Sequence, residues 1–310
     1  MRVAIAQDAP VFLDAAASCE RAIGWMERAK EQGARLVVFG ETWLPGYPFW
    51  ITQTNGARFN DARQKRAYAQ YLEAAVEADG PELRRLEEAS RDLGLALIMG
   101  LVERGRQSAS GSVYCSLVFA HPERGLAPTH RKLVPTYEER LAWCPGDGAG
   151  LRTHELDGLR ISALNCWENW MPQPRHALYA QGTQVHVAIW PGCRRLTRDI
   201  TRFVALEGRV FCVSASGMMA REDVPEDFEL ADALDDGVYY DGGSAIAGPD
   251  GEWVVPPEST ARELICADLD PRRVAEERQN FDPTGHYARP DIFHVEVDRS
   301  RRVAAHFSGD

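Results

Sequence analysis

Three side chains with complementary chemistry follow, or lie on, predicted core strands. Cys166 comes just after the apolar run Ile161–Leu164, Glu41 comes just after Leu36–Phe39, and Lys132 lies in an extended segment. A thiol can act as a nucleophile, a carboxylate can accept its proton, and an ammonium can stabilise negative charge on a substrate. Ligands bind at the carboxyl ends of strands in open α/β sheets, so the three groups could share one site. Spacing alone leaves open that Cys166 is a buried structural thiol and that the two charges simply leave the core.

The elements that must position these residues follow the order of an α/β protein. Short continuous apolar runs alternate with segments of helical periodicity, and strands without polar alternation are typical of buried sheets. We expect strands at Val3–Ala6, Leu36–Phe39, Leu95–Gly100, Val113–Phe119, Ile161–Leu164, Val185–Ala188, Val210–Ser214, Ser244–Ala247, Trp253–Val255 and Glu263–Asp268. We expect helices at Leu13–Glu31, Asn60–Ala78, Pro81–Leu93, Arg175–Gln181, Leu196–Gly208 and Pro271–Glu277, with a loop over Thr42–Gly56 and one helical turn at Glu138–Ala142.

The predicted elements repeat coarsely along the chain. Each half has the order β-α-β-α-β-β, and two such halves packed sheet against sheet would bury both sheets. No Ser/Gly-rich or Pro-rich linker separates the halves, so we expect residues 1–310 to form one domain with two pseudo-two-fold related halves. The acidic stretch Glu222–Asp236 is predicted to be a solvated surface loop, with a role as a lid over the site as the alternative.

Composition excludes several classes of function. The net charge of −11 argues against nucleic acid and anionic membranes as partners, since both repel an acidic surface. The apolar run at the N-terminus is too short for a signal peptide, and no stretch approaches the ~20 apolar residues of a membrane span. The seven cysteines include no Cys-x-x-Cys pair, which predicts free thiols in a reducing cytoplasm. The eight histidines show no ligand spacing, so we predict no metal and no cofactor.

Four longer motifs are spread over nearly the whole chain: Val38–Pro48, His130–Arg140 with Gly146-Asp147-Gly148, Asn165–Pro172 with Trp190-Pro191, and Gly285–Asp291. In sequence and in order they resemble the motifs of the nitrilase superfamily. The Cys-Trp-Glu sequence at Cys166 is similar to that of the true nitrilase branch. Gly40 stands where the family most often has proline, and Gln173-Pro174 replaces a usually apolar pair. These departures alter the edges of the expected pocket and leave the substrate range open.

The resemblance implies an α-β-β-α four-layer sandwich with a catalytic triad of Glu41, Lys132 and Cys166. It also implies a second active-site glutamate, which we assign to Glu139 and not to its neighbour Glu138; without the motif, Glu139 would be interpreted as a surface acid at a helix end. The flanking residues His130 and Arg131 are assigned no chemistry.

The implied activity is hydrolysis of an organic nitrile to a carboxylic acid and ammonia through a cysteine thioimidate and thioester. The alternatives are an amidase, a hydratase-type activity that stops at the amide, a non-catalytic binding protein on the same fold, and a redox-sensing thiol protein. The expected partners are a small-molecule nitrile and further copies of the chain, as a homodimer or higher homo-oligomer. We expect the C-terminal segment, about 280–310, to lie in a subunit interface.

Aromatic residues near the motifs are candidates for the substrate pocket, because ligand sites are mostly apolar. We select Tyr47, Trp167 and Trp190, although aromatic residues of this kind are more often part of the core than substrate contacts. The backbone N–H groups of Asn165 and Trp167 are candidates for contacting a reaction intermediate.

Overall fold

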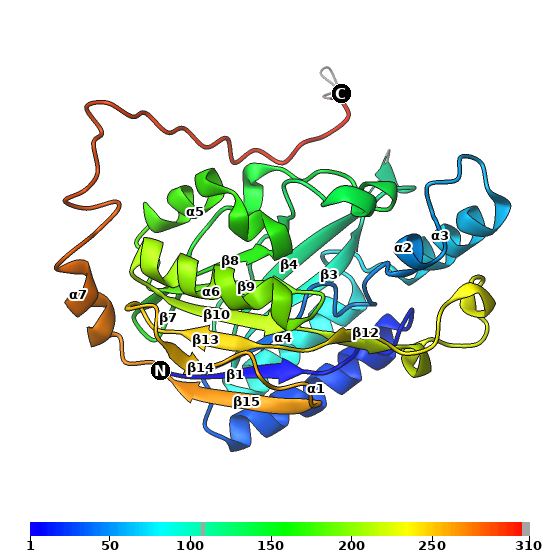
Figure 1. Ribbon diagram of the computed structural model, residues 1–310, viewed down its shortest axis with the longest axis horizontal. Helices are drawn as coiled ribbons and strands as arrows, with labels where there is room; N and C mark the ends of the chain where they lie inside the picture. Colours follow the sequence, from blue (N-terminus) through cyan, green and yellow to red (C-terminus); the bar gives the residue numbers. More distant parts are fainter. Residues whose placement is uncertain (107–108, 306–310) are drawn as a thin grey trace.

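The chain folds into four layers, with two sheets packed face to face between two layers of helices (Figure 1). The structure is a computed structural model that describes residues 1–106 and 109–305. In these residues the helices are α1 (Ala15–Glu31), α2 (Trp50–Gln53), α3 (Ala62–Ala74), α4 (Pro81–Leu93), α5 (Pro172–Tyr179), α6 (Arg194–Gly208) and α7 (Arg272–Arg278). No helix in this part of the chain is long and apolar enough to cross a membrane.

The first sheet is built mainly from the N-terminal half. Its strands lie in the order β15 (Glu263–Asp268), β1 (Arg2–Gln7), β2 (Leu36–Phe39), β3 (Ala96–Arg104), β4 (Val113–His121) and β5 (Gly125–Leu126), and β6 (His130–Arg131) also pairs with β4. Strands β1, β2 and β3 are parallel, whereas β15 and β4 are antiparallel to their neighbours. The last strand of the second half therefore belongs to the first sheet, which the repeat pattern did not predict.

The second sheet is built from the C-terminal half. Its strands lie in the order β14 (Trp253–Val255), β13 (Ala245–Ala247), β10 (Phe211–Ser216), β9 (Val185–Trp190), β8 (Leu159–Asn165) and β7 (His154–Leu156). The central strands β8, β9 and β10 are parallel. A separate hairpin, β11 (Met218–Ala220) and β12 (Val238–Asp241), carries the acidic loop between its strands.

Alternate residues of each strand face different layers. In β1, Val3 and Ile5 pack into the core between the two sheets, whereas Ala4 and Ala6 pack against α1 and α4. The outer face of the second sheet packs against α6 through Ile200. Each sheet is thus buried on both faces, which explains the unalternating apolar strands. The predicted α-β-β-α sandwich is confirmed.

Several predicted boundaries are wrong for local reasons. The helix predicted at Asn60–Ala78 ends at Ala74, because Val76 forms a bridge with Glu103 beside the first sheet. The helix predicted at Arg175–Gln181 begins earlier, at Pro172, where proline suits the first turn. The predicted loop Thr42–Gly56 contains α2.

The acidic loop is tied to the body by ion pairs. Arg63 and Arg66 of α3 pair with Glu229, and Arg63 also pairs with Asp232. Short 3₁₀ turns at Arg221–Asp223 and Ala231–Ala233 lie within this stretch. The prediction of a solvated surface loop holds only in part: Val224, Phe228, Leu230 and Ala231 are buried in a core cluster. Part of the loop's charge is neutralised by α3.

The C-terminal segment after α7 follows an extended path along the outside of the molecule, past α5 (Figure 1). Its far end is held by Arg301, which pairs with the buried Asp147 and donates to the backbone oxygen of Thr129. Phe293 and Val295 line an apolar surface hollow together with residues of α5.

Candidate active site

Cys166 lies where strand β8 ends and the chain turns sharply into the 3₁₀ helix Cys166–Trp170. Its φ is +46°, a left-handed conformation that is uncommon for a residue with a side chain. The amide of Asn169 holds the turn by donating to the backbone oxygen of Cys166 at 2.8 Å, and its oxygen contacts His186 at 2.7 Å. The turn is thus fixed by a buried polar network and exposes the thiol to the interior of the site.

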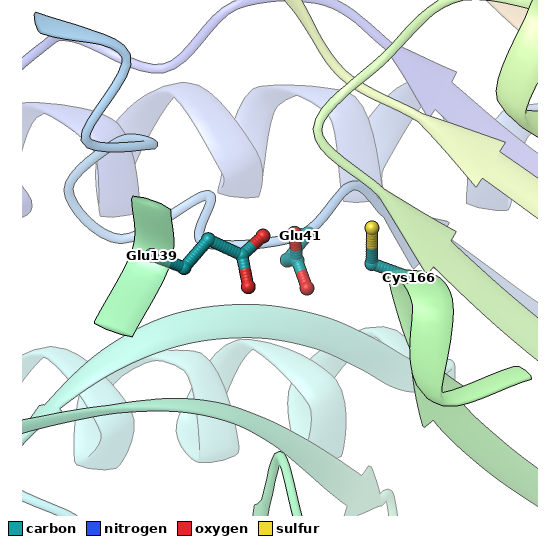
Figure 2. Close-up of side chains that lie close together, drawn as sticks. All are labelled: Glu41, Glu139 and Cys166. Atoms are coloured by element: carbon teal, nitrogen blue, oxygen red, sulfur yellow. The ribbon is translucent and has the colours of Figure 1, made fainter. Parts of the chain in front are cut away.

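Glu41, Glu139 and Lys132 form one buried cluster beside this thiol. The Lys132 Nζ is 3.0 Å from Glu41 Oε1 and 2.7 Å from Glu139 Oε2. One atom each of Glu41, Glu139 and Cys166 lie within 4.8 Å of one another, and Figure 2 shows the Glu41 carboxylate between the other two side chains. The structure therefore brings together all four residues that the sequence assigned to catalysis, from three separate segments of the chain.

Each carboxylate is positioned by its local backbone. The backbone N–H of Glu41 donates to the Trp190 oxygen at 3.0 Å, so the two sheets meet at the site. This approach requires Gly40, because a Cβ there would lie 2.7 Å from the Gly217 nitrogen. Glu139 closes a capping box with Thr136.

The choice between the two adjacent glutamates is clear in the geometry. Glu139 accepts a hydrogen bond from the Tyr47 hydroxyl at 2.8 Å in addition to that from Lys132. Glu138 points away and accepts from Thr52 at an exposed position. Glu139 therefore lies inside the cluster, whereas Glu138 lies outside it.

Burial and neighbouring charge set the protonation of the cluster. Burial raises the pKa of Glu41 to about 7 against the opposing charge of Lys132, and Glu139 adds to the rise. Burial alone would lower the pKa of Lys132, but the nearby acids hold it well above its usual value. Burial, together with Glu41 and Glu139, raises the pKa of the Cys166 thiol, which Lys132 opposes. The resting thiol is therefore protonated and needs a base, and Glu41 has a pKa suited to that role near neutral pH.

A second buried carboxylate joins the segments that carry Cys166 and Lys132. Glu168 accepts from the backbone N–H of Asn165 at 3.0 Å and of Leu133 at 2.9 Å. Its two oxygens lie 3.0 and 2.9 Å from Nε2 of His130. Burial would raise the pKa of Glu168, but His130 and these N–H groups hold it below its usual value. Glu168 thus fixes the distance between the thiol turn and the lysine segment.

Of the three aromatic side chains predicted to line the pocket, one lies in the site, one in the core and one at the surface. Tyr47 lies in the site, with its hydroxyl on Glu139 and its ring against Tyr240 of β12. Trp190 is fully buried and belongs to the same core cluster as Cys166, between the second sheet and α6. The Trp167 side chain is 49% exposed and packs beside Trp170, while its backbone N–H is directed at the Cys166 thiol.

A small cavity borders the cluster on the side of the β11–β12 hairpin. Its volume is about 20 Å³, which is room for about one water molecule, and its walls include Glu41, Tyr47, Met218, Met219 and Tyr240. The hairpin that carries the acidic loop thus covers one side of the site.

Two carboxylates and a thiol this close together are donor types that can bind a cation. In this site the positive charge is supplied by Lys132, whose ammonium already bonds both carboxylates. The ammonium offsets one of the two carboxylate charges and occupies the position between them.

Sequence reasoning missed three groups in the site. Cys115 of β4 contacts Glu41, Tyr240 of β12 contacts Tyr47, and Glu168 pairs with His130. The only available signal was Glu168, which lies in the Cys-Trp-Glu motif. Cys115 lies in an apolar run that showed nothing beyond a core strand.

Comparisons with known proteins agree with this geometry. A family model described as carbon-nitrogen hydrolase matches residues 2–279. A protein named nitrilase 2, from an unknown prokaryotic organism, is 39% identical over 299 residues, covering 96% of this chain and 92% of its own. An aliphatic nitrilase of Sinorhizobium fredii is 36% identical over 307 residues, covering 98% of this chain and 97% of its own.

Solved structures show the same fold. The amidase NitN from a Nesterenkonia species has a TM-score of 0.65 at 22% identity, and the match covers 91% of this chain and 99% of that one. Its likeness supports the four-layer architecture alone. The resemblance inferred from the four motifs is thus confirmed by the family model and by full-length relatives.

Proposed function

Because this chain belongs to the carbon-nitrogen hydrolase family, we propose that it hydrolyses an organic nitrile to a carboxylic acid and ammonia. The names of its full-length relatives favour a nitrile over other carbon–nitrogen substrates. The single observation that carries the proposal is the buried cluster in which Lys132 bonds Glu41 and Glu139 beside the Cys166 thiol. A scaffold protein has no need to bury two carboxylates and an ammonium around a thiol, because burying charges is costly.

The first half of the proposed reaction makes a thioimidate. Glu41 accepts the proton of Cys166 as the sulfur bonds to the nitrile carbon. One π electron pair of the C≡N bond moves onto the nitrogen, which becomes negatively charged. Lys132 stabilises that charge, and a proton from Glu41 or Lys132 neutralises it. A soft sulfur nucleophile suits this step, because a neutral nitrile is a poor electrophile.

The second half consumes two waters. Glu41 takes a proton from the first water as it adds to the thioimidate carbon, and passes this proton to the nitrogen. The proton of the new hydroxyl also moves to the nitrogen, so ammonia leaves and a thioester remains on sulfur. The second water releases the acid and returns the proton to the thiol. Glu139 holds Lys132 and Tyr47 in place throughout. Tyr47 and the Trp167 backbone N–H form the proposed substrate contacts, whereas Trp190 packs in the core cluster that contains Cys166. No step uses a cofactor.

The test is a product balance. Purified protein is incubated with aliphatic, aromatic and arylacetonitriles, and acid, amide and ammonia are quantified. We expect at least one class to yield acid and ammonia in equal amounts, because the thioester can only be released as acid. Amide as the sole product would instead indicate a hydratase-type activity, and turnover of amides but not of nitriles would indicate an amidase.

We further propose that the chain acts as a homo-oligomer through a face that carries exposed apolar side chains. Trp167, Trp170, Phe203 and Leu206 are each at least 40% exposed, and neighbouring rings in this set lie 6.2–6.3 Å apart. The C-terminal segment crosses the adjoining surface of α5 (Figure 1). Contiguous exposed patches of this kind mark interaction sites, and the self-association expected from the family makes a second copy the proposed occupant.

Replacing Phe203 by aspartate should weaken this association. A charge in the centre of an apolar contact is expected to cost about 2 kcal/mol or more, about 30-fold in the dissociation constant. Light scattering across a dilution series measures it. Phe59→Asp is the matched control, because Phe59 is fully exposed and far from the patch in sequence. A wild-type protein that is monomeric at every concentration would exclude the interface.

The seven cysteines all lie in the described part of the chain and none is paired with another. Free thiols are typical of reducing compartments, which supports the proposed cytoplasmic location.

A further inference from the structure

A buried cysteine outside the proposed triad contacts two of its members. The Cys115 Sγ lies 3.4 Å from Glu41 Oε1, and the backbone oxygen of Cys115 accepts from the backbone N–H of Lys132 at 2.8 Å. Cys115 lies on β4 and is 1% exposed. The pairing of β4 with β6, which ends just before Lys132, therefore places the Cys115 thiol against the carboxylate of Glu41.

The two oxygens of the Glu41 carboxylate differ in their partners. Oε1 receives both the Lys132 ammonium and the Cys115 thiol. Among the described residues, no group donates to Oε2, although this atom is also buried. A buried carboxylate oxygen without a donor is costly. Protonation is therefore more favourable at Oε2 than at Oε1, which already accepts two hydrogen bonds.

We propose that Cys115 is a positioning residue for the general base. Its S–H donates to Oε1, holds the carboxylate in one orientation, and leaves Oε2 as the atom that takes the proton of Cys166. The inference rests on the proposed function in so far as Glu41 is the base and Cys166 the nucleophile.

The buried thiol of Cys19 has a different kind of partner. Cys19 of α1 has the backbone oxygen of Glu82 as its neighbour at 3.6 Å, and it lies in the core between helices and the first sheet. A thiol that only fills space needs no carboxylate beside it. Cys115 does pack with apolar residues, including Tyr71 and Trp143, so its steric role must be separated from its role as a donor.

The donor role predicts a direction for the titration of the site. A hydrogen bond to the charged carboxylate lowers the pKa of Glu41, whereas burial raises it. The other titratable groups around Glu41, from every element packed against it, are Lys132, Glu139, Cys166, Tyr47, Tyr71 and Tyr240. Since the charge states of neighbouring groups are coupled to that of Glu41, the measured midpoint belongs to the set and not to Glu41 alone. Loss of the donor should move that midpoint upward.

The experiment measures the alkylation of Cys166 by iodoacetamide as a function of pH, resolved by peptide mass spectrometry. In Cys115→Ala, the midpoint of reactivity should rise by about 0.5–1 pH unit, because S–H is a weak donor and hydrogen bonds to ionised groups are stronger than neutral ones. In Cys115→Ser, the hydroxyl keeps a donor, and the midpoint should lie at or below that of the wild type. Cys19→Ala removes a buried thiol elsewhere and should leave the midpoint unchanged.

Two results would overturn the inference: an unchanged midpoint in Cys115→Ala, or equal upward shifts in the alanine and serine variants, which would indicate a steric role. The alkylation readout requires no nitrile turnover. If the wild type hydrolyses no nitrile and yet the midpoints move as expected, the proposed substrate is wrong and the role of Cys115 stands. The pH profile of kcat/KM for any accepted substrate should show the same displacement of its acidic limb.

Discussion

Replacing Cys166 by alanine is expected to lower nitrile turnover by at least about 10⁴-fold, because the proposed reaction passes through bonds to its sulfur. The rest of the cluster, with Lys132 between Glu41 and Glu139, does not depend on this thiol for its hydrogen bonds. The site should therefore remain assembled, and the loss should appear in kcat with little change in the midpoint of urea unfolding. Both Cys and Ala carry a Cβ, so the strain of the positive φ is common to both.

The measurement pairs steady-state kinetics with intact-protein mass spectrometry. Wild-type protein quenched in acid during turnover should carry an added mass equal to the acyl group, and the variant should not. Cys212→Ala is the matched control, because Cys212 is a fully buried thiol in the same apolar cluster as Cys166. Turnover of nitriles by Cys166→Ala at the wild-type rate would refute covalent catalysis by this residue.

Two buried sheets packed face to face were predictable from burial, and the resemblance to the nitrilase superfamily added the four-layer arrangement. Continuous apolar runs such as Leu36–Phe39 are typical of strands covered on both faces, and two such sets in one chain favour two packed sheets. The position of Glu263–Asp268 was not predictable in the same way. Its pairing with β1 is a contact between the two ends of the chain, and no local pattern encodes the edge of a sheet on which a late strand will lie.

The site residues, too, include some that the sequence could predict and some that it could not. Glu41, Lys132 and Cys166 were found through motifs several residues long, which spacing alone could not have joined. Cys115 was missed because its role follows from the register between β4 and β6, and a cysteine in an apolar strand has the same local pattern whether it faces a core or a carboxylate.

The Trp167 side chain was selected for its place in the motif. Its orientation depends on the turn at Cys166, which directs the backbone N–H inward and the indole toward Trp170 at the surface. A sequence motif identifies the segment that lies at the site more easily than it identifies which group of a residue, the side chain or the backbone N–H, faces the site.

Replacing Lys132 by methionine is expected to affect both catalysis and stability. Activity should fall by ~10²–10⁴-fold, because no group then stabilises the charge that develops on the substrate nitrogen. The folded state should lose ~3–5 kcal/mol, because Glu41 and Glu139 remain buried without their common partner. Methionine matches the length of the lysine stem, so the change removes mainly the charge and its hydrogen bonds.

The loss of stability should depend on pH with a definite sign. Burial already raises the pKa of Glu41 to about 7, and the opposing charge of Lys132 is absent in the variant, so the folded carboxyl should hold its proton to still higher pH. Its unfolded pKa is about 4.3. Between these values the folded state binds more protons than the unfolded state, so the free energy of unfolding falls as pH rises. The variant should therefore lose more stability than the wild type between pH 5.5 and pH 8.

Urea unfolding at those two pH values measures the difference, with Lys30→Met, a substitution at an exposed position of α1, as the control. A variant whose stability relative to the wild type is the same at both values would show that Lys132 does not neutralise the two carboxylates. The same variant with Glu139 also replaced by glutamine should recover part of the stability and none of the activity. One of the two buried charges is then removed, whereas the ammonium needed by the substrate is still missing. This double variant separates the structural role of Lys132 from its chemical one.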